Sequence, residues 1–168
     1  MVANILPLWF LRQPDQARLL RLVAGPVVVS TIHQRSFQQL IDDMAQTMVH
    51  ARGIGLAAPQ IGQSMRLAVI DGGVAQQTEP LVLINPVVKQ STPNQEAMEE
   101  GCLSIPGVFG LVPRPTGLSM TALDRRGATI SLNAVGLLAR VIQHEIDHLN
   151  GRLFIDRVTR ITAGKIPS

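Results

Sequence analysis

The sequence has few of the residues that mark secreted or nucleic-acid-binding proteins. Its 168 residues include one cysteine, no tyrosine and only 3% aromatic residues. A single cysteine cannot form a disulfide within the chain, which is typical of a protein in a reducing cytosol. The core must be mostly aliphatic, and no RNA-binding aromatic motif is present. These absences favour a cytoplasmic protein without specific nucleic-acid binding.

Long runs of charge or of hydrophobic residues are also absent. The net charge is +3, and most positive charges are arginines scattered along the chain. This pattern more often serves solubility, although an acidic partner or a ribosomal surface would also fit. The apolar N-terminal stretch is interrupted by Pro7 and Arg12 and has no basic leader. We therefore expect neither a signal peptide nor a membrane span.

The overall composition predicts a folded globule, since 46% of the residues are hydrophobic and 16% are charged. No repeat, linker or low-complexity segment divides the chain. We therefore expect one domain that spans residues 1–168.

The first half of the chain contains one clear helical pattern. Apolar residues recur at helical spacing between residues 37 and 48, which predicts an amphipathic helix that ends near Gly53. Ser36 and Gln39 would form its capping box. The preceding residues 1–35 are predicted to be an irregular arm with a strand-like run at 27–32.

Several apolar runs predict β-strands. Residues 65–71 and 81–85 have the pattern of buried strands, and a turn-rich loop follows at 90–95. Residues 117–124 and 128–132 are expected to pair as a hairpin. Strands that flank two helices without regular alternation predict an α+β fold, with mixed, mainly antiparallel sheets around a central helix.

The central helix would carry His144-Glu145-Ile146-Asp147-His148. On a helix of about 3.6 residues per turn, positions four apart share a face, so both imidazoles can bind one metal ion while Glu145 reaches a water bound to it. The alternative is a solvated helix face. The surrounding residues are strongly apolar, however, and charged groups among them need partners. The pattern therefore favours a hydrolytic metal site.

A catalytic metal site needs a third protein ligand and an open position. The metzincin pattern would place a histidine where this chain has Phe154, and no glutamate follows Glu145 as a thermolysin-like site requires. Asp156 is too close in sequence to be an obvious substitute, so the third ligand should lie upstream. The only cysteine, Cys102, is a candidate, because a thiolate beside two imidazoles completes a tetrahedral site with one position left for water.

The glycine-rich stretch GIGLAAPQIG at 53–62 partly matches the dinucleotide-binding fingerprint. That fingerprint follows a strand and opens a helix, whereas this stretch follows a predicted helix and runs into Pro59. A plain glycine turn remains one interpretation. The other is an extended segment that a peptide can approach, with Gln60 as an amide donor.

Three motifs in order, GIGLAAPQIG, EEGCLSIPG and QHEIDHLNG, resemble those of the peptide deformylase family. The resemblance extends from about residue 41 to residue 158 and includes LINP at 83–86. It implies a cytoplasmic bacterial enzyme that removes the N-formyl group from N-terminal formylmethionine of newly made polypeptides; an organellar source stays open. A transient ribosome contact would go with this role.

The resemblance also implies roles for individual residues. One divalent metal ion, Fe2+ in the family with Zn2+ or Ni2+ as alternatives, would be bound by Cys102, His144 and His148. Glu145 would act on the metal-bound water as general base and then as general acid. The groups that hold the oxyanion would be Gln60 and the backbone N–H of Leu103.

The substrate peptide is expected to lie as an added strand against residues 53–56 and 107–111. The resemblance implies that the substrate-binding residues are Ile54, Gly55, Glu100, Gly101, Leu137 and Val141. Glu100 would also support the metal site. The aliphatic members of this set could equally be plain core residues.

Two features depart from the family pattern. Arg140 occupies a helix position where many members carry an apolar residue, so we expect a more polar or partly blocked pocket rim. The chain also stops soon after the last motif, which puts ribosome attachment through a C-terminal helix in doubt. Two rival interpretations stay open: a cysteine hydrolase with Cys102 as nucleophile, and a structural metal or peptide-binding module without turnover.

Overall fold

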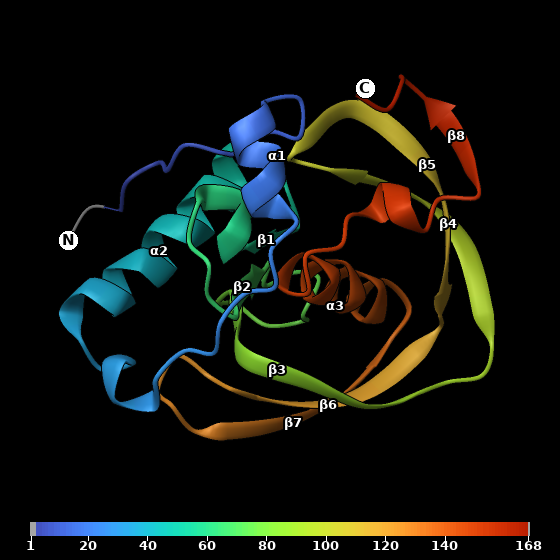
Figure 1. Ribbon diagram of the computed structural model, residues 1–168. Coiled ribbons are helices and arrows are strands. Elements are labelled where there is room, and N and C mark those ends of the chain that lie inside the picture. The colour runs from blue at the N-terminus through green and yellow to red at the C-terminus, as the bar shows by residue number, and fades with distance from the viewer. Residues whose placement is uncertain (1–2, 168) are drawn as a thin grey trace.

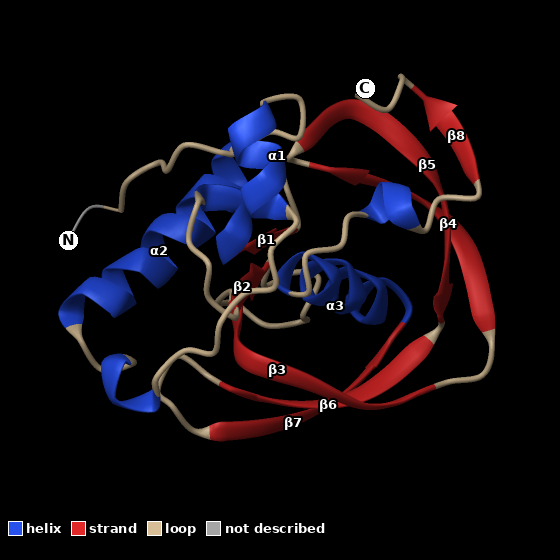
Figure 2. Ribbon diagram, viewed as in Figure 1, coloured by secondary structure: helices blue, strands red, loops and turns tan. Residues whose placement is uncertain are grey.

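Helix α3 (Gly136–Leu149) lies at the centre of the structure, with antiparallel strands below and beside it (Figure 1). The structure is a computed structural model that describes residues 3–167. Residues 1, 2 and 168, the ends of the range predicted as one domain, lie outside the described residues. Helices and strands do not alternate regularly (Figure 2). The predicted α+β class is confirmed, and its mainly antiparallel sheets surround the helix that carries HEIDH.

The larger sheet has five strands in the order β1-β2-β3-β6-β7, and all neighbouring pairs are antiparallel. Its strands are β1 (Gly55–Ala57), β2 (Leu67–Ile70), β3 (Leu81–Ser91), β6 (Gly117–Leu123) and β7 (Thr129–Val135). The strands predicted at 65–71 and 81–85 and the hairpin predicted within 117–132 are confirmed. Among the described strands β1 pairs only with β2, so it forms one edge of this sheet.

Helices cover both faces of the larger sheet, and this arrangement explains why β2 and β3 are continuous apolar runs. Alternate strand residues point to opposite faces. Val69 and Val82 pack in one cluster with α2 (Arg35–His50), whereas Ile70 and Leu83 pack in another cluster with α3. The helix residues that meet these strands are Phe37, Ile41, Met44 and Met48 on α2, and Ala139, Ile142 and Ile146 on α3.

The smaller sheet has the order β4-β5-β8 and was not predicted. Its strands are β4 (Gln95–Cys102), β5 (Ile105–Pro115) and β8 (Arg160–Ala163). The prediction of a loop over 90–95 was wrong at both ends, because β3 continues to Ser91 and β4 begins at Gln95. The hairpin of β4 with β5 forms most of this sheet, and the exposed residues of β4 carry no clear period that would predict a strand.

The N-terminal arm is more regular than predicted. It contains helix α1 (Pro14–Leu20), which has proline in its first turn, as helices favour. The predicted strand at 27–32 is wrong, since this segment includes the short 3-10 helix η1 (Val29–Thr31) instead. The nearest bridge is formed by Gly25 with Met65. β-branched residues alone do not make a strand where no partner strand lies alongside.

The capping box predicted for α2 is also wrong. The N-cap is Gln34, whose side chain makes no cap hydrogen bond, and Ser36 lies inside the helix. The amide of Gln39 donates to Asp43 at 2.8 Å. The helix itself is confirmed and ends at His50. Two further 3-10 turns occur, η2 (Ala58–Ile61) and η3 (Phe154–Asp156).

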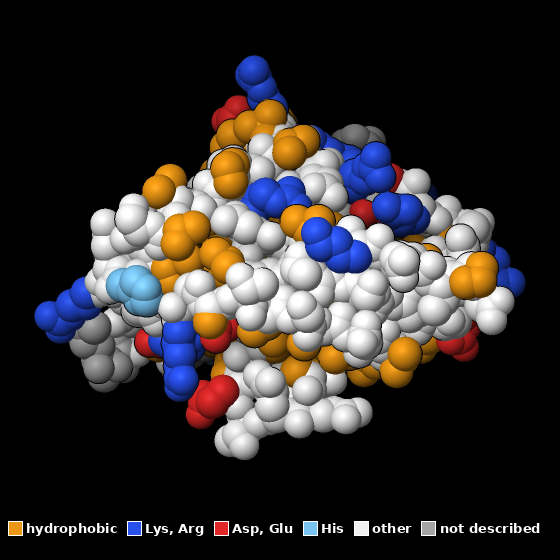
Figure 3. Space-filling view, turned by 90° about the horizontal axis from the view of Figure 1, so that it is seen from below, with side chains coloured by type: hydrophobic (Ala, Val, Ile, Leu, Met, Phe, Trp, Pro, Cys, Tyr) orange, Lys and Arg blue, Asp and Glu red, His pale blue; other side chains and the backbone are white. Residues whose placement is uncertain are grey.

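The side of the molecule formed by β3, β6 and β7 faces the viewer in Figure 3. Its middle is largely covered by uncharged polar side chains and backbone, while hydrophobic side chains form separate groups. Along β7, exposed and partly buried residues alternate. Ser131 and Asn133 are exposed, whereas Leu132 between them packs against the core cluster. Within residues 3–167, no helix is both long and apolar enough to cross a membrane.

Candidate metal centre

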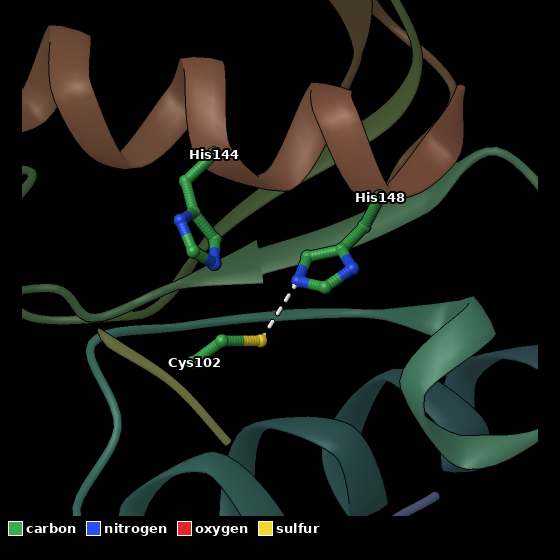
Figure 4. Close-up of side chains that lie close together, drawn as sticks. All are labelled: Cys102, His144 and His148. Atoms are coloured by element: carbon green, nitrogen blue, oxygen red, sulfur yellow. Dashed lines mark hydrogen bonds between the residues drawn. The ribbon is translucent and has the colours of Figure 1, made fainter. Parts of the chain in front are cut away.

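The two histidines of α3 and the only cysteine converge on one point (Figure 4). Cys102 is the last residue of β4, and its Sγ lies 3.2 Å from Nε2 of His148. The ring centroids of His144 and His148, one helical turn apart, are separated by 5.0 Å. One ligand atom from each of the three residues lies within 4.8 Å of the others. Four-residue spacing on the helix and the end of a strand thus bring the predicted metal ligands together.

The chemistry of this cluster fits a bound metal ion. A thiol sulfur and two imidazole nitrogens form the ligand set of a catalytic tetrahedral site with one open position. Among the described residues, the buried atoms Oε2 of Glu145 and Nδ1 of His148 have no hydrogen-bond partner. Buried polar atoms rarely stay unpaired, and such exceptions often mark a water, an ion or a reacting group. The cluster therefore has the composition of a hydrolytic metal site, and Oε2 of Glu145 beside it is an unsatisfied acceptor.

Glu100 on β4 fixes the orientation of His144. Its Oε2 lies 3.0 Å from Nδ1 of His144, which leaves the other ring nitrogen for the metal. Arg114 donates to both oxygens at 2.6 and 2.9 Å, and Arg140 donates to Oε1 at 2.7 Å. Burial raises the pKa of Glu100, but hydrogen bonds from His144 and Arg114 outweigh it and lower the pKa from 4.5 to about 2. Glu100 is therefore a fixed negative charge beside the cluster.

The electrostatics around the two histidines favour a cation between them. Burial lowers the pKa of His144, but the hydrogen bonds to Cys102 and Glu100 outweigh burial and raise it from 6.5 to about 10. Burial and the neighbouring charge of His144 hold the pKa of His148 well below its usual value. The groups that favour a proton on His144 would equally favour a metal ion.

Asp147 and Arg114 extend this network, and the sequence argument did not assign them. Nη1 of Arg114 donates to Oδ2 of Asp147 at 2.7 Å, and both side chains are buried. On the other side of Asp147, Arg157 donates two hydrogen bonds of 2.7 and 2.8 Å. A carboxylate within a strongly apolar helix was the available signal, because it needs a buried cationic partner. Its partner is Arg114, which has no local sequence signature.

Glu145 is buried at the inner end of the cavity, where its carboxylate rests against the backbone of β1. A Cβ on Gly55 would lie 2.3 Å from Oε1 of Glu145, so only glycine leaves room for this contact. Burial is the main reason that the pKa of Glu145 is raised from 4.5 to about 7. A carboxylate with a pKa near neutrality is suited to take up and return a proton.

Gln60, in the 3-10 turn after β1, points its amide at the same place. Its Oε1 accepts a hydrogen bond from the backbone N–H of Ala57 at 2.9 Å, which fixes the side chain. Its Nε2 lies 3.5 Å from Sγ of Cys102 and 3.3 Å from Oγ of Ser104. Ser104 is fully buried and was not assigned from the sequence. The amide donor predicted in this extended segment thus lies beside the cysteine.

A cavity of about 540 Å³ opens beside the cluster. Its lining contains Gln60, Leu103, Glu145 and all of the predicted substrate-binding residues, Ile54, Gly55, Glu100, Gly101, Leu137 and Val141. Val108 and Phe109 of the lining lie in the segment 107–111 that was expected to contact the peptide, whereas Ala51 and Arg52 were not assigned from the sequence. The Phe109 ring lies across Gly101, where a Cβ would be 2.7 Å from the ring. This pairing explains the glycine that precedes Cys102.

Arg140 also lines the cavity, but its charge does not stand free at the rim as expected. The side chain is 8% exposed, and its guanidinium group hydrogen bonds to Glu100, Val112 and Glu96. The charge is thus paired with Glu100 and does not stand free at the rim, and the expectation of a partly blocked rim stays a prediction. Exposure of the neighbouring aliphatic Leu137 keeps the rim apolar on this side.

Comparison with known proteins agrees with this site. The family model for polypeptide deformylase matches residues 7–163. A peptide deformylase of Halothermothrix orenii is 48% identical over 143 residues, which cover 85% of this chain and 89% of that protein. A peptide deformylase of Rhizobium meliloti is 46% identical over 159 residues, covering 94% and 87%.

Solved structures give the same result. The crystal structure of a peptide deformylase from Synechococcus elongatus in complex with actinonin has 46% identity and a TM-score of 0.83, and the match covers 95% of this chain and 82% of that one. A peptide deformylase from Acinetobacter baumannii has 33% identity and a TM-score of 0.85, with coverages of 93% and 100%. Since sequence, fold and ligand cluster all agree over nearly the whole chain, this protein belongs to the peptide deformylase family.

Proposed function

We propose that this protein hydrolyses the formyl amide at N-terminal formylmethionine of newly made polypeptides, with Glu145 as the group that moves the protons. Membership of the peptide deformylase family supports removal of a formyl group. The observation that carries the finer proposal is the position of Glu145. It is buried beside the cluster of Cys102, His144 and His148 and lines the cavity into which a peptide end could enter.

A divalent metal ion would be held by Cys102, His144 and His148, whose ligand atoms already lie close together. When bound, this ion would lower the pKa of a water molecule and polarise the formyl carbonyl. We propose Fe2+ as the native ion. A ligand set of one sulfur and two imidazole nitrogens also accepts Zn2+ and Ni2+.

Glu145 would transfer protons twice in one turnover. Its carboxylate would first take a proton from the water that attacks the formyl carbon. It would then deliver this proton to the nitrogen of the leaving amine, so that formate and a free N-terminus result. The pKa of about 7, caused mainly by burial, suits both steps near neutral pH.

Negative charge that develops on the formyl oxygen would be stabilised by two donors from different elements. One is Nε2 of Gln60, which the Ala57 N–H holds in place through the other end of the amide. The other is the backbone N–H of Leu103, in the turn between β4 and β5. Loss of one such donor typically costs about 100-fold to 1000-fold in rate.

The substrate would bind as an added strand at the free edge of β1, with the hairpin of β4 and β5 on its other side. Its methionine side chain would enter the cavity between Ile54, Leu137 and Val141. One structure of the Acinetobacter baumannii relative is bound to Met-Ala-Ser, which supports a peptide that begins with methionine. Such substrates would place the protein in the bacterial cytoplasm, in transient contact with the ribosome.

The Cys102 contact with His148 also fits a second candidate function, a thiol hydrolase with Cys102 as nucleophile. The two candidates differ in metal dependence, since removal of a metal would not stop a thiol nucleophile. They also differ in Glu145, which has no role in the thiol reaction.

The test measures formate release from formyl-Met-Ala-Ser under anaerobic conditions. Ferrous wild type is compared with metal-stripped wild type and with Glu145→Ala of measured iron content. We expect activity only in the ferrous wild type. No formate from iron-loaded wild type would rule out the proposed function, and full activity of metal-stripped protein would favour the thiol hydrolase.

A further inference from the structure

Arg140 connects helix α3 to both strands of the β4–β5 hairpin. Its Nη1 donates to Oε1 of Glu100 at 2.7 Å and to the carbonyl of Val112 at 2.9 Å. Its Nη2 donates to the carbonyl of Glu96 at 2.6 Å. One side chain of the helix thus binds a side chain of β4, the backbone of β4 and the backbone of β5.

The elements that Arg140 joins both line the cavity. Helix α3 contributes Leu137 and Val141 to the lining, and the hairpin contributes Gly101, Val108 and Phe109. A change in the separation of the helix and the hairpin would therefore change the shape of the cavity. Two of the three acceptors, the carbonyls of Glu96 and Val112, lie away from the metal ligands, whereas the third, Glu100, also contacts His144.

The physical properties of the arginine suit this connection. Both Arg140 and Glu100 are buried, with side chains 8% and 5% exposed, so water competes little for their hydrogen bonds. The guanidinium group is rigid and planar, and it presents several donors in fixed directions. Lysine could keep the charge but could not reproduce three acceptors in this geometry.

We propose that Arg140 is a positioning residue that sets the width of the side-chain pocket and thereby its preference for methionine over bulkier side chains. This inference rests on the proposed function, because it concerns the methionine end of the substrate. It assigns to Arg140 a role in selectivity through the hairpin, without contact with the reacting atoms. Glu100 would keep Arg114 as a partner when Arg140 is replaced, so the metal cluster would stay intact.

The experiment compares wild type with Arg140→Met and Arg140→Lys on three substrates, formyl-Met-Ala-Ser, formyl-norleucyl-Ala-Ser and formyl-Phe-Ala-Ser. The substitution Arg140→Met keeps an unbranched apolar side chain at this position but removes every hydrogen bond that the guanidinium group makes. We expect KM for formyl-Met-Ala-Ser to rise about tenfold and the ratio of kcat/KM for Met over Phe to fall about tenfold. One methylene in a pocket is typically worth about 10-fold to 200-fold. The kcat for formyl-Met-Ala-Ser should stay within about threefold, and Arg140→Lys should recover part of the ratio.

Binding of the product peptides Met-Ala-Ser and Phe-Ala-Ser, measured by calorimetry, gives a second readout that needs no turnover. In Arg140→Met the preference for Met-Ala-Ser should fall by the same factor as the kinetic ratio. The control Arg126→Met makes the same chemical change at an exposed residue of the β6–β7 turn and should leave both ratios unchanged.

Arg157→Met is a second control, because it removes hydrogen bonds from the same ionic network outside the cavity lining. It should lower the melting temperature without a change in the Met over Phe ratio.

An Arg140→Met protein that is less stable but keeps the wild-type ratio would overturn the inference, as would an equal loss of kcat on all substrates. If Arg140→Met does not fold, an unchanged ratio in Arg140→Lys would overturn it. Formate release from formyl-Met-Ala-Ser by the wild type would support the proposed function independently, so that failure of the inference about Arg140 can be told apart from failure of the proposed function.

Discussion

Helix α3 and the β4–β5 hairpin both supply residues to the metal cluster, but different forces hold them in place. The inner face of α3 is buried among aliphatic side chains of the larger sheet, such as Leu83 and Met120. The outer part of β4 is exposed over residues 95–99, and its inner end is fixed by charges around Glu100. Apolar packing against the larger sheet positions the helix that carries the two histidines. The cysteine strand is positioned by the ionic network around Glu100 together with a smaller apolar cluster that includes Ile105 and Val112.

This difference teaches that one site can have two kinds of sensitivity. Apolar packing is non-directional and resists changes in pH and salt. A buried ionic network is directional, and removal of one partner leaves the other charge unpaired. Apolar truncations on α3 should therefore act on global stability alone, whereas changes in the ionic network of the hairpin should act on both global stability and the metal site.

The largest effect is expected from Glu100→Ala. This change leaves two buried arginines without their shared carboxylate, which should lower the free energy of unfolding by about 3–5 kcal/mol. It also removes the acceptor of His144, so metal affinity should fall about 10-fold to 100-fold. Urea unfolding of metal-free protein and chelator competition measure the two effects. Glu96→Ala, at an exposed side chain of the same strand, is the control; wild-type stability in Glu100→Ala would contradict the role of the network.

The next effect is expected from Ile142→Ala on the helix. Ile142 is fully buried in the cluster between α3 and the larger sheet. Its truncation should lower the free energy of unfolding by about 2–5 kcal/mol, while the folded fraction keeps its metal affinity. Urea unfolding and metal titration below the transition test both statements, with the half-exposed Ile166→Ala as control. A selective loss of metal affinity would show that the two regions are not separable in this way.

The pH dependence of stability should distinguish the regions further. The pKa of Glu100 is lowered in the folded protein from 4.5 to about 2, so its stabilising contribution is complete above pH 4.5. This contribution is lost as the pH falls from about 4.5 towards 2, because the unfolded chain binds the proton first. Unfolding of metal-free wild type and Glu100→Gln at several pH values measures the difference. Equal slopes in both proteins would contradict the assignment to Glu100.

The smallest effect is expected from Arg157→Ala. The Arg157 side chain is 40% exposed, and Arg114 still pairs with Asp147 after its removal. We expect a loss of no more than about 1 kcal/mol, which should shrink at high salt. Thermal unfolding at two salt concentrations is the measurement. A loss of stability as large as that of Glu100→Ala would mean that the buried ionic network depends on the partly exposed Arg157.

The same contrast explains how much of the molecule could be predicted from the sequence. The HEIDH helix was predictable because helical spacing is local information, and it places His144 and His148 on one face. The β4–β5 hairpin was missed although its turn is short, because residues 95–99 are exposed and show no alternation of apolar and polar residues. The strand predicted at 27–32 was wrong because no partner strand lies alongside it.

The candidate site follows this division. The residues predicted as metal ligands lie together and the residues predicted to bind substrate line the cavity, since three local motifs carry them, while their roles stay predictions. The supporting residues Arg114 and Asp147 were not assigned, and the pairing of Arg140 with Glu100 was not expected. Each of these side chains finds its partner on another element, and one sequence does not contain the distances between elements.

Because Gly55 has no side chain, it affects the geometry of the proposed reaction. The Glu145 carboxylate rests directly against the backbone of β1 at this residue, where a Cβ would lie 2.3 Å from its oxygen. Under the proposed strand pairing, the substrate would bind the other side of the same short segment. The backbone at Gly55 would then contact both the Glu145 carboxylate and the substrate strand. The register of that strand would therefore set the distance between Glu145 and the formyl amide bond.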